Sequence, residues 1–510
     1  NTALGYAALS ANTTGDDNVA IGSKALESNT TAHRNTAIGY YALTANTTGV
    51  QNTAVGYAAL DANTTGSPND AFGHHALGAN TTGNQNVAVG HGSLKLNTTA
   101  SNNVAIGHSA LEANTTGVKN IAVGTQALDA NTTGQQNLAI GHNALGVNTT
   151  ADYNVALGSN ALNANTTGST NVAIGLQTLN ANTTGNHNIA IGKTALHDNT
   201  TATANIAIGG HTLEKNTTGE KNIAIGVYAL DENTIGSHNT AVGYQALSLN
   251  TEGYSNVSIG WKTLEKNTTG DQNVALGRDA LGENTTANNN TAVGHNALSL
   301  NTTGTQNTAV GANALDANTT ASSNTAFGYD SLTSNTTGYQ NTAIGHNCLD
   351  ANTTGNNNVA LGRAALGANT TASDLTAIGH QALTANTTGA GVTGVGSNAL
   401  AANTTGTNST AVGYAALISC TTGVDNTALG VNALYSNTTG NYNIGIGRNA
   451  NYSCTTASGN IAIGYTALSA NTASHNTAIG HGVLAVNTSG SNNVAIGTYS
   501  LDANTTANEN

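Results

Sequence analysis

The sequence of 510 residues contains no methionine, a single proline (Pro68) and only three cysteines. Charged residues make up 7% of it, whereas a typical soluble domain has roughly 25%. The lack of proline excludes a collagen-like or proline-rich rod. Because only 12 Lys and Arg residues are present and the net charge is −13, the chain cannot neutralise many phosphates. Nucleic acid is therefore not an expected partner.

Long apolar runs are absent as well. No run approaches the roughly 20 residues that a membrane-spanning helix needs. We therefore expect no membrane span.

What the sequence contains instead is one repeated unit. The unit that opens at Asn1 restarts at Asn18 and continues to Asn493; twenty-nine units have 17 residues and one, 460–475, has 16. With its places numbered one to seventeen, the consensus reads N-[TVI]-A-[IVL]-G-x-x-A-L-x-x-N-T-T-[GA]-x-x. Since Asn510 starts a further unit, we expect residues 1–510 to be a single continuous repeat array cut from a longer chain.

The unit predicts strands rather than helices. Glycine at place five and Asn-Thr-Thr-Gly at places twelve to fifteen interrupt any helical pattern of apolar residues. Places two to four, such as Val19–Ile21, predict a first short strand, and places seven to ten, such as Tyr41–Thr44, predict a second. Glycine at place five indicates a bend that needs positive φ or a close backbone approach. The Asn-Thr-Thr-Gly segment is typical of a return turn.

Two short strands and two turns make one coil, so the sequence predicts an all-β parallel β-solenoid of about 30 coils with 17 residues in each. Like residues would stack about 4.8 Å apart. We expect the aliphatic residue at place four and leucine at place nine to point inward. These two side chains supply about 3–6 kcal/mol, against about 1–2 kcal/mol of ordering cost for each residue. A single coil is therefore unstable, and stability must come from stacking.

Alanine at place three would then point outward in nearly every coil. A small apolar residue repeated on an outer face indicates close contact with another surface, and a second copy of the chain is the simplest candidate. The alternative, that alanine is merely neutral there, stays open.

A column of rings is predicted at place six. His74, His91 and His108 occupy this place in consecutive units, with His75 beside them. Imidazoles about 4.8 Å apart could share a soft divalent metal ion. No column of carboxylates accompanies them, so we expect a surface column of amphipathic rings that contacts sugars, surfaces or a neighbouring chain.

The Asn-Thr-Thr sequence is formally an N-glycosylation acceptor in most units. Glycans on every coil would stand about 4.8 Å apart, which is less than their own width. We expect instead that asparagine at place twelve forms an inward ladder, in which each amide bonds the next. Sparse or threonine-linked sugars stay open.

The cysteines do not indicate catalysis. Cys348 replaces the alanine of place eight and is typical of a small buried hydrophobe. Cys420 and Cys454 replace asparagine at place twelve in units two coils apart, which puts them about 9.5 Å from each other, too far for a disulfide. No Cys-x-x-Cys motif is present.

No part of the repeat predicts an active site. The 25 Asp and Glu residues are scattered over the variable places, and the aliphatic residues do not recur every six places as in left-handed acyltransferase helices. The calcium-binding Gly-Gly-x-Gly-x-Asp repeat is missing as well. We expect no catalytic, cofactor-binding or metal-binding residues, and no enzyme activity.

Units such as 103–107, Asn-Val-Ala-Ile-Gly, resemble the head repeats of bacterial trimeric autotransporter adhesins. The longer form at 35–49, Asn-Thr-Ala-Ile-Gly-Tyr-Tyr-Ala-Leu-Thr-Ala-Asn-Thr-Thr-Gly, is similar to repeats in bacterial and phage tail-fibre-like surface proteins. The resemblance covers the whole chain. It implies a left-handed parallel β-roll, three chains side by side, and an adhesive or stalk role outside the cell.

The function expected from these features is that of an extracellular structural fibre, the shaft or head of an adhesin-like cell-surface protein. Its partners would be copies of itself, as a homotrimer or filament, and surface glycans. One alternative is a phage tail-fibre shaft. Another is an ice-binding β-solenoid, with threonine at places thirteen and fourteen as a hydroxyl array. Adjacent threonines in a turn should not share one flat face, which disfavours ice binding.

Overall fold

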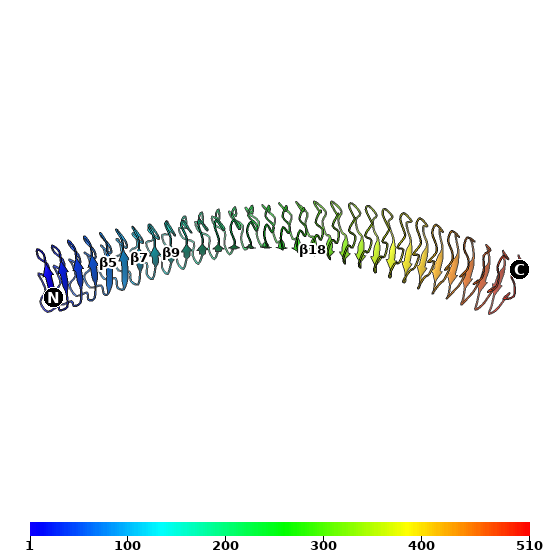
Figure 1. The fold of residues 1–510 in the computed structure, drawn as a ribbon, viewed down its shortest axis with the longest axis horizontal. Helices are drawn as coiled ribbons and strands as arrows, with labels where there is room; N and C mark the ends of the chain where they lie inside the picture. The colour runs from blue at the N-terminus through cyan, green and yellow to red at the C-terminus, as the bar shows by residue number, and fades with distance from the viewer. The chain divides into compact units, whose positions relative to one another are not determined.

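The computed structural model describes residues 1–510 as two compact units, Asn1–Ser255 and Asn256–Asn510. Each unit contains fifteen coils, and each coil carries one strand of three or four residues, with no helix. Figure 1 shows the strands of each unit as successive arrows, one to a coil.

The first unit contains β1 to β15. Their bounds are β1 Thr2–Leu4, β2 Val19–Ile21, β3 Thr36–Ile38, β4 Thr53–Val55, β5 Asn69–Phe72, β6 Asn86–Val89, β7 Val104–Ile106, β8 Ile121–Val123, β9 Leu138–Ile140, β10 Val155–Leu157, β11 Val172–Ile174, β12 Ile189–Ile191, β13 Ile206–Ile208, β14 Ile223–Ile225 and β15 Thr240–Val242.

The second unit contains β16 to β30. Their bounds are β16 Val257–Ile259, β17 Val274–Leu276, β18 Thr291–Val293, β19 Thr308–Val310, β20 Thr325–Phe327, β21 Thr342–Ile344, β22 Val359–Leu361, β23 Thr376–Ile378, β24 Thr393–Val395, β25 Thr410–Val412, β26 Thr427–Leu429, β27 Ile444–Ile446, β28 Ile461–Ile463, β29 Thr477–Ile479 and β30 Val494–Ile496.

Neighbouring strands of a unit pair in parallel, and each place lies opposite the same place of the next coil. Between β2 and β3, Ala20 lies opposite Ala37. The 16-residue coil keeps this pairing, with Ile461 of β28 opposite Thr477 of β29. The predicted parallel β-solenoid with about 17 residues per turn is confirmed.

Places seven to ten do not form the predicted second strand. Residues at places seven and nine have left-handed backbone angles, as in Tyr41 (φ 58°) and Leu43 (φ 53°), whereas a strand needs extended ones. The N–H groups of places seven and nine still bond to adjacent coils: that of Tyr41 donates to the carbonyl of Ser23 (3.1 Å) and that of Leu43 to the carbonyl of Ala59 (2.9 Å). The segment is therefore a series of turns that contributes hydrogen bonds along the stack.

The side chains at places three and four point in directions opposite to those predicted: place three points inward and place four outward. Alanine at place three is fully buried, as in Ala20 and Ala37, while Ile38 at place four is 37% exposed. Neighbouring side chains of a strand alternate, so the burial of asparagine at place one brings place three inward with it. The interior is narrow there, because a Cβ on Gly445 at place three would lie 3.0 Å from Cγ of Leu434. Leucine at place nine is buried, as predicted.

Glycine at place five meets both conditions that the sequence indicated. Gly39 has a φ of 138°, and a Cβ on it would lie 2.2 Å from the carbonyl oxygen of Gly56 in the next coil. The bend therefore leaves no room for a side chain.

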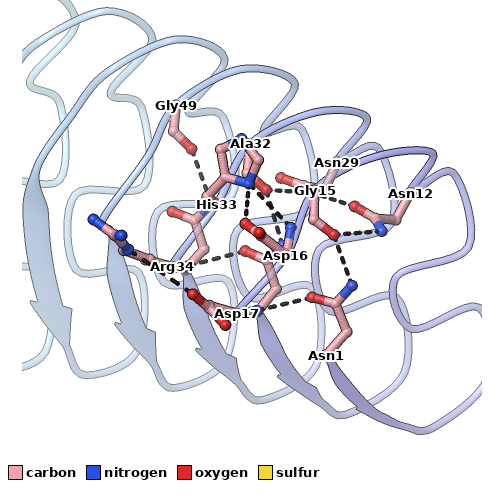
Figure 2. A network of polar contacts seen from close by, with 12 residues as sticks. Asn1, Asn12, Gly15, Asp16, Asp17, Asn29, Ala32, His33, Arg34 and Gly49 are labelled. Carbon is pink, nitrogen blue, oxygen red and sulfur yellow. Dashed lines mark hydrogen bonds and ion pairs between the residues drawn. The ribbon is translucent and has the colours of Figure 1, made fainter.

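Two columns of asparagine run through the interior. At place twelve, Nδ2 of Asn29 donates to Oδ1 of Asn12 (3.0 Å), which confirms the predicted ladder (Figure 2). At place one, the backbone N–H of Asn18 donates to Oδ1 of Asn1 (2.9 Å). Both columns also donate to the carbonyl at place fifteen, since Nδ2 of Asn1 and of Asn12 each reach the oxygen of Gly15 (2.7 and 3.0 Å). Each return turn is thereby tied to the start of the strand in its own coil, and the place-twelve ladder ties it to the adjacent coil.

Candidate functional site

The outward side chains of the strands form a surface that repeats in every coil. In each unit we call the side chains at places two and four the strand face. Place four is always Ile, Val, Leu or Phe, and place two is Thr, Val, Ile or Leu in every coil but one. Parallel pairing places these side chains in two columns, one residue per coil.

Place four of the strand face is apolar in every coil, and its side chains are half-buried or exposed. Ile106, Leu429 and Phe327 at place four are 40%, 47% and 55% exposed. Its only charged residue is Asp70 of β5. Contiguous exposed apolar surface of this kind marks an interaction site in soluble proteins. The outward apolar residue is thus the aliphatic of place four and not, as expected, the alanine of place three.

A second surface is the ring column that the sequence indicated at place six. Tyr40, Tyr57, His74, His91 and His108 stack in five consecutive coils. Their ring centroids lie 4.9–5.4 Å apart, with planes within 18° of parallel. Because each inner ring is covered by its neighbours on both faces, mainly ring edges reach the solvent. A sugar ring, which would stack on a face, finds open faces only at the two ends of the column.

The three imidazoles of the column do not converge on one point. Parallel rings direct their nitrogens side by side, and no group of three or more His, Cys, Asp or Glu side chains is placed to hold a metal ion. Burial, together with the neighbouring His75 and His91, holds the pKa of His74 below its usual value. The neutral form of His74 is therefore favoured, which suits a stack of uncharged rings.

The Asn-Thr-Thr segment presents only one of its three side chains to the solvent. Asn29 at place twelve is fully buried, and its Nδ2 already donates to Asn12 and Ala32, so it is not accessible as a glycosylation acceptor in the folded chain. The hydroxyl of Thr30 at place thirteen donates to the carbonyl of Thr47 (3.2 Å). Thr31 at place fourteen is exposed. Threonine at these two places therefore makes a single exposed column rather than a flat array.

Pairs of histidine with carboxylate stand on the surface rather than in an enclosed cleft. Beside a hollow of about 340 Å³, His33 contacts Asp16, and their side chains are 47% and 73% exposed (Figure 2). His211 binds Glu214 at 2.7 Å, and their side chains are 28% and 31% exposed. Pairs that the solvent reaches lack the low-dielectric surroundings that make catalytic groups effective.

One carboxyl group differs from the other acidic residues in its surroundings. Burial raises the pKa of Asp231 to about 6, and its Oδ1 has no hydrogen-bond partner. The adjacent Lys215 pairs with Glu232 (2.6 Å) instead. Asp231 is thus a half-buried acid at the edge of a surface ion pair.

The cysteines lie where the sequence placed them. All three are free and fully buried. Burial raises the pKa of Cys348 to about 12 and those of Cys420 and Cys454 to about 11. Since the thiolate is the reactive form, these thiols are chemically quiet at neutral pH.

A scan against protein-family models and a search of curated proteins each find no match to this chain. The structure contains no helix with the length and apolarity of a membrane span. The sequence did not predict two features of the structure: the outward direction of place four and the buried asparagine column at place one. The asparagine column could have been predicted from the sequence, because place one is asparagine in every coil except those that begin at Leu375, Val392 and Ser409.

Proposed function

We propose that the chain is the repeat region of an extracellular structural fibre whose copies associate side by side through their strand faces. The observation that carries the proposal is the strand face itself, a row of exposed aliphatic residues with one charge among thirty coils. A face that met only water would accumulate polar residues at place four, and none is present there.

Energetics support a long contact rather than a short one. Covering the exposed parts of the two outward side chains contributes roughly 1 kcal/mol per coil at 25 cal/mol per Å². Association itself costs about 4–15 kcal/mol. The fifteen coils of a unit therefore suffice to offset this cost, whereas a few coils do not.

The resemblance to adhesin heads and tail-fibre repeats supports the rest of the proposal. It suggests three copies in the assembly, a location outside the cell, and a role as the shaft or head of a surface protein. A phage tail-fibre shaft would use the same contact. Surface glycans, if bound, would meet the ring column or the exposed threonines rather than the strand face.

The test is the assembly state of the full chain by analytical ultracentrifugation. We expect the wild type to sediment as an oligomer and a triple variant of the strand face, Ile174→Lys, Ile191→Lys and Ile208→Lys, to have an association constant at least tenfold smaller. The matched control places the same charges in the same coils at the exposed place fourteen: Thr184→Lys, Thr201→Lys and Thr218→Lys. The control should remain an oligomer, and circular dichroism checks that both variants fold. A wild type that stays monomeric at micromolar concentration at both pH 7.5 and pH 4.5 contradicts the proposal.

Ice binding is a second candidate, on a surface other than the one expected. Threonine occupies place two in runs of consecutive coils, such as Thr291, Thr308, Thr325 and Thr342, in regular register on an uncharged face. A monomeric chain whose thermal hysteresis is abolished by Val293→Lys, Val310→Lys and Phe327→Lys, which lie at place four of these coils, would favour this candidate. An oligomeric chain without hysteresis would reject it.

A further inference from the structure

One residue stands out on the strand face. Asp70 of β5 is the only charged residue at places two and four in the whole chain. It is half-buried and lies opposite Thr53 of β4 and Val87 of β6 in the parallel pairing.

The carboxylate of Asp70 has no partner within its own chain. It forms no side-chain hydrogen bond and no ion pair. Most other strand-face residues are apolar and need no such partner, whereas a carboxylate does. The strands on either side present Thr53, Val55, Val87 and Val89 on the same face, none of which titrates. The ionisable groups of these coils stand beyond the bend of place five, at places six, seven and ten: Tyr57, Asp61, His74, His75, His91 and Lys95.

A second strand face cannot supply the missing partner. Places two and four contain no Lys, Arg or His in any coil, so no stagger between two strand faces brings a cation to Asp70. If the copies are related by a symmetry axis parallel to the stack of coils, equivalent coils lie side by side, and Asp70 of one copy meets Asp70 of another. In a staggered one, it meets threonine or an aliphatic side chain. Either arrangement removes water from an unpaired carboxylate, which disfavours its charged form.

We infer that Asp70 makes the association of the strand faces dependent on pH, with the protonated carboxyl group favouring the assembled state. This inference rests on the proposed side-by-side association and names its regulation. A carboxylic acid can donate a hydrogen bond to the carboxyl group of another copy or to a threonine hydroxyl, which a carboxylate cannot do.

The sign follows from linkage. Assembly takes up protons, so the association constant rises as pH falls, by up to tenfold per pH unit for each proton taken up. The rise vanishes at high pH, where the carboxyl group is charged in both the free and the assembled chain. Acid therefore tightens the assembly and neutral pH loosens it.

The experiment measures the association constant of the full chain by sedimentation equilibrium between pH 7.5 and 4.5. For the wild type we expect at least a tenfold increase over this range. Asp70→Asn, which is similar in size and uncharged, should associate at pH 7.5 at least tenfold more tightly than the wild type and should lose most of the pH dependence. Asp425→Asn is the matched control, because Asp425 is exposed at place seventeen, and it should behave as the wild type does.

The outcomes separate the two proposals. If wild type and Asp70→Asn associate equally at every pH, the role of Asp70 is wrong and the strand-face contact stands. If Asp70→Asn keeps the full pH dependence, the histidines of the ring column or another group carry it, and the inference is likewise wrong. If no variant associates at any pH, both the contact and its regulation are refuted.

Discussion

Asparagine at place twelve has two roles in each coil. Its amide donates to the turn carbonyl at place fifteen and to the asparagine of the preceding coil, as Asn46 does to Gly49 and Asn29. A buried amide that lacks one of these bonds is costly, because it has lost water without gaining a partner. Substitutions in this column therefore test the ladder directly.

Cys420 interrupts the column, and Asn403 before it bears the consequence. Oδ1 of Asn403 is buried without a hydrogen-bond partner, because Cys420 has no amide to donate. We expect Cys420→Asn to restore the bond and to raise the local free energy of unfolding by about 1–2 kcal/mol. Amide hydrogen exchange in the adjoining coils measures this. The control is Cys348→Ala, which installs the usual residue of place eight and should change exchange little. Faster exchange in Cys420→Asn would contradict the ladder account.

Asn451 is the only residue other than leucine at place nine. It is fully buried, and neither of its amide atoms has a hydrogen-bond partner. Asn451→Leu should therefore stabilise the surrounding coils by about 1–3 kcal/mol, by removing an unsatisfied polar group and filling the leucine column. Thermal unfolding and local amide exchange would show it. A loss of stability would mean that the site does not accept leucine, which would contradict the view that place nine offers the same leucine site in every coil.

Thiol chemistry gives an independent measure of burial. Because the pKa values of the three cysteines are raised to about 11 or 12, the groups stay protonated as thiols at pH 8 in the folded chain. We expect a thiol reagent to label the native protein at least a hundredfold more slowly than the protein in urea. Rapid labelling of the native chain would show that place twelve or place eight is open to solvent.

At the scale of the element, the bend at place five is more restrictive than the strand it follows. Gly209 has a φ of 135°, and a Cβ there would lie 2.8 Å from the backbone of Gly226. Its neighbour Gly210 has nothing within 4 Å of an added Cβ. The pair therefore allows a comparison within one coil.

We expect Gly209→Ala to destabilise the coil by about 2–3 kcal/mol, because alanine disfavours this backbone angle and clashes with the next coil. Gly210→Ala should be neutral or stabilise by up to about 1 kcal/mol, since it restricts the unfolded chain. Urea unfolding of both variants measures the difference. Equal effects would mean that the bend does not require glycine.

The first strand of each coil could be predicted from its β-branched residues, and the bend from its glycine. The second strand could not be ruled out, because Tyr41–Thr44 has a composition that a strand accepts. Its left-handed angles at places seven and nine are seen only in the structure. The predicted direction of the first strand was wrong. The larger side chain at place four was assigned to the core, whereas a core that already holds leucine and two asparagines has room only for alanine.

At the scale of the whole molecule, each unit is held together by repetition. Every coil bonds only to its neighbours, through strand pairing, the turns of places seven to eleven and the asparagine columns. Stability is then close to a sum over coils and their interfaces. The only apolar surface that this arrangement leaves uncovered in every coil is the strand face, and side-by-side association would cover it.

An oligomer was predicted from the sequence because alanine at place three was expected to point outward, and that reason was wrong. The association remains a proposal, which now rests on place four.

A cryo-EM cross-section of the assembled full chain tests this account most directly. The account predicts coils from separate copies with their strands turned toward one another, so that the side chains of place four fill the contact. The ring column and the threonines of place fourteen would then face the solvent. A cross-section in which each chain stands alone, or in which the copies touch through the ring column while the strand face meets water, would contradict it.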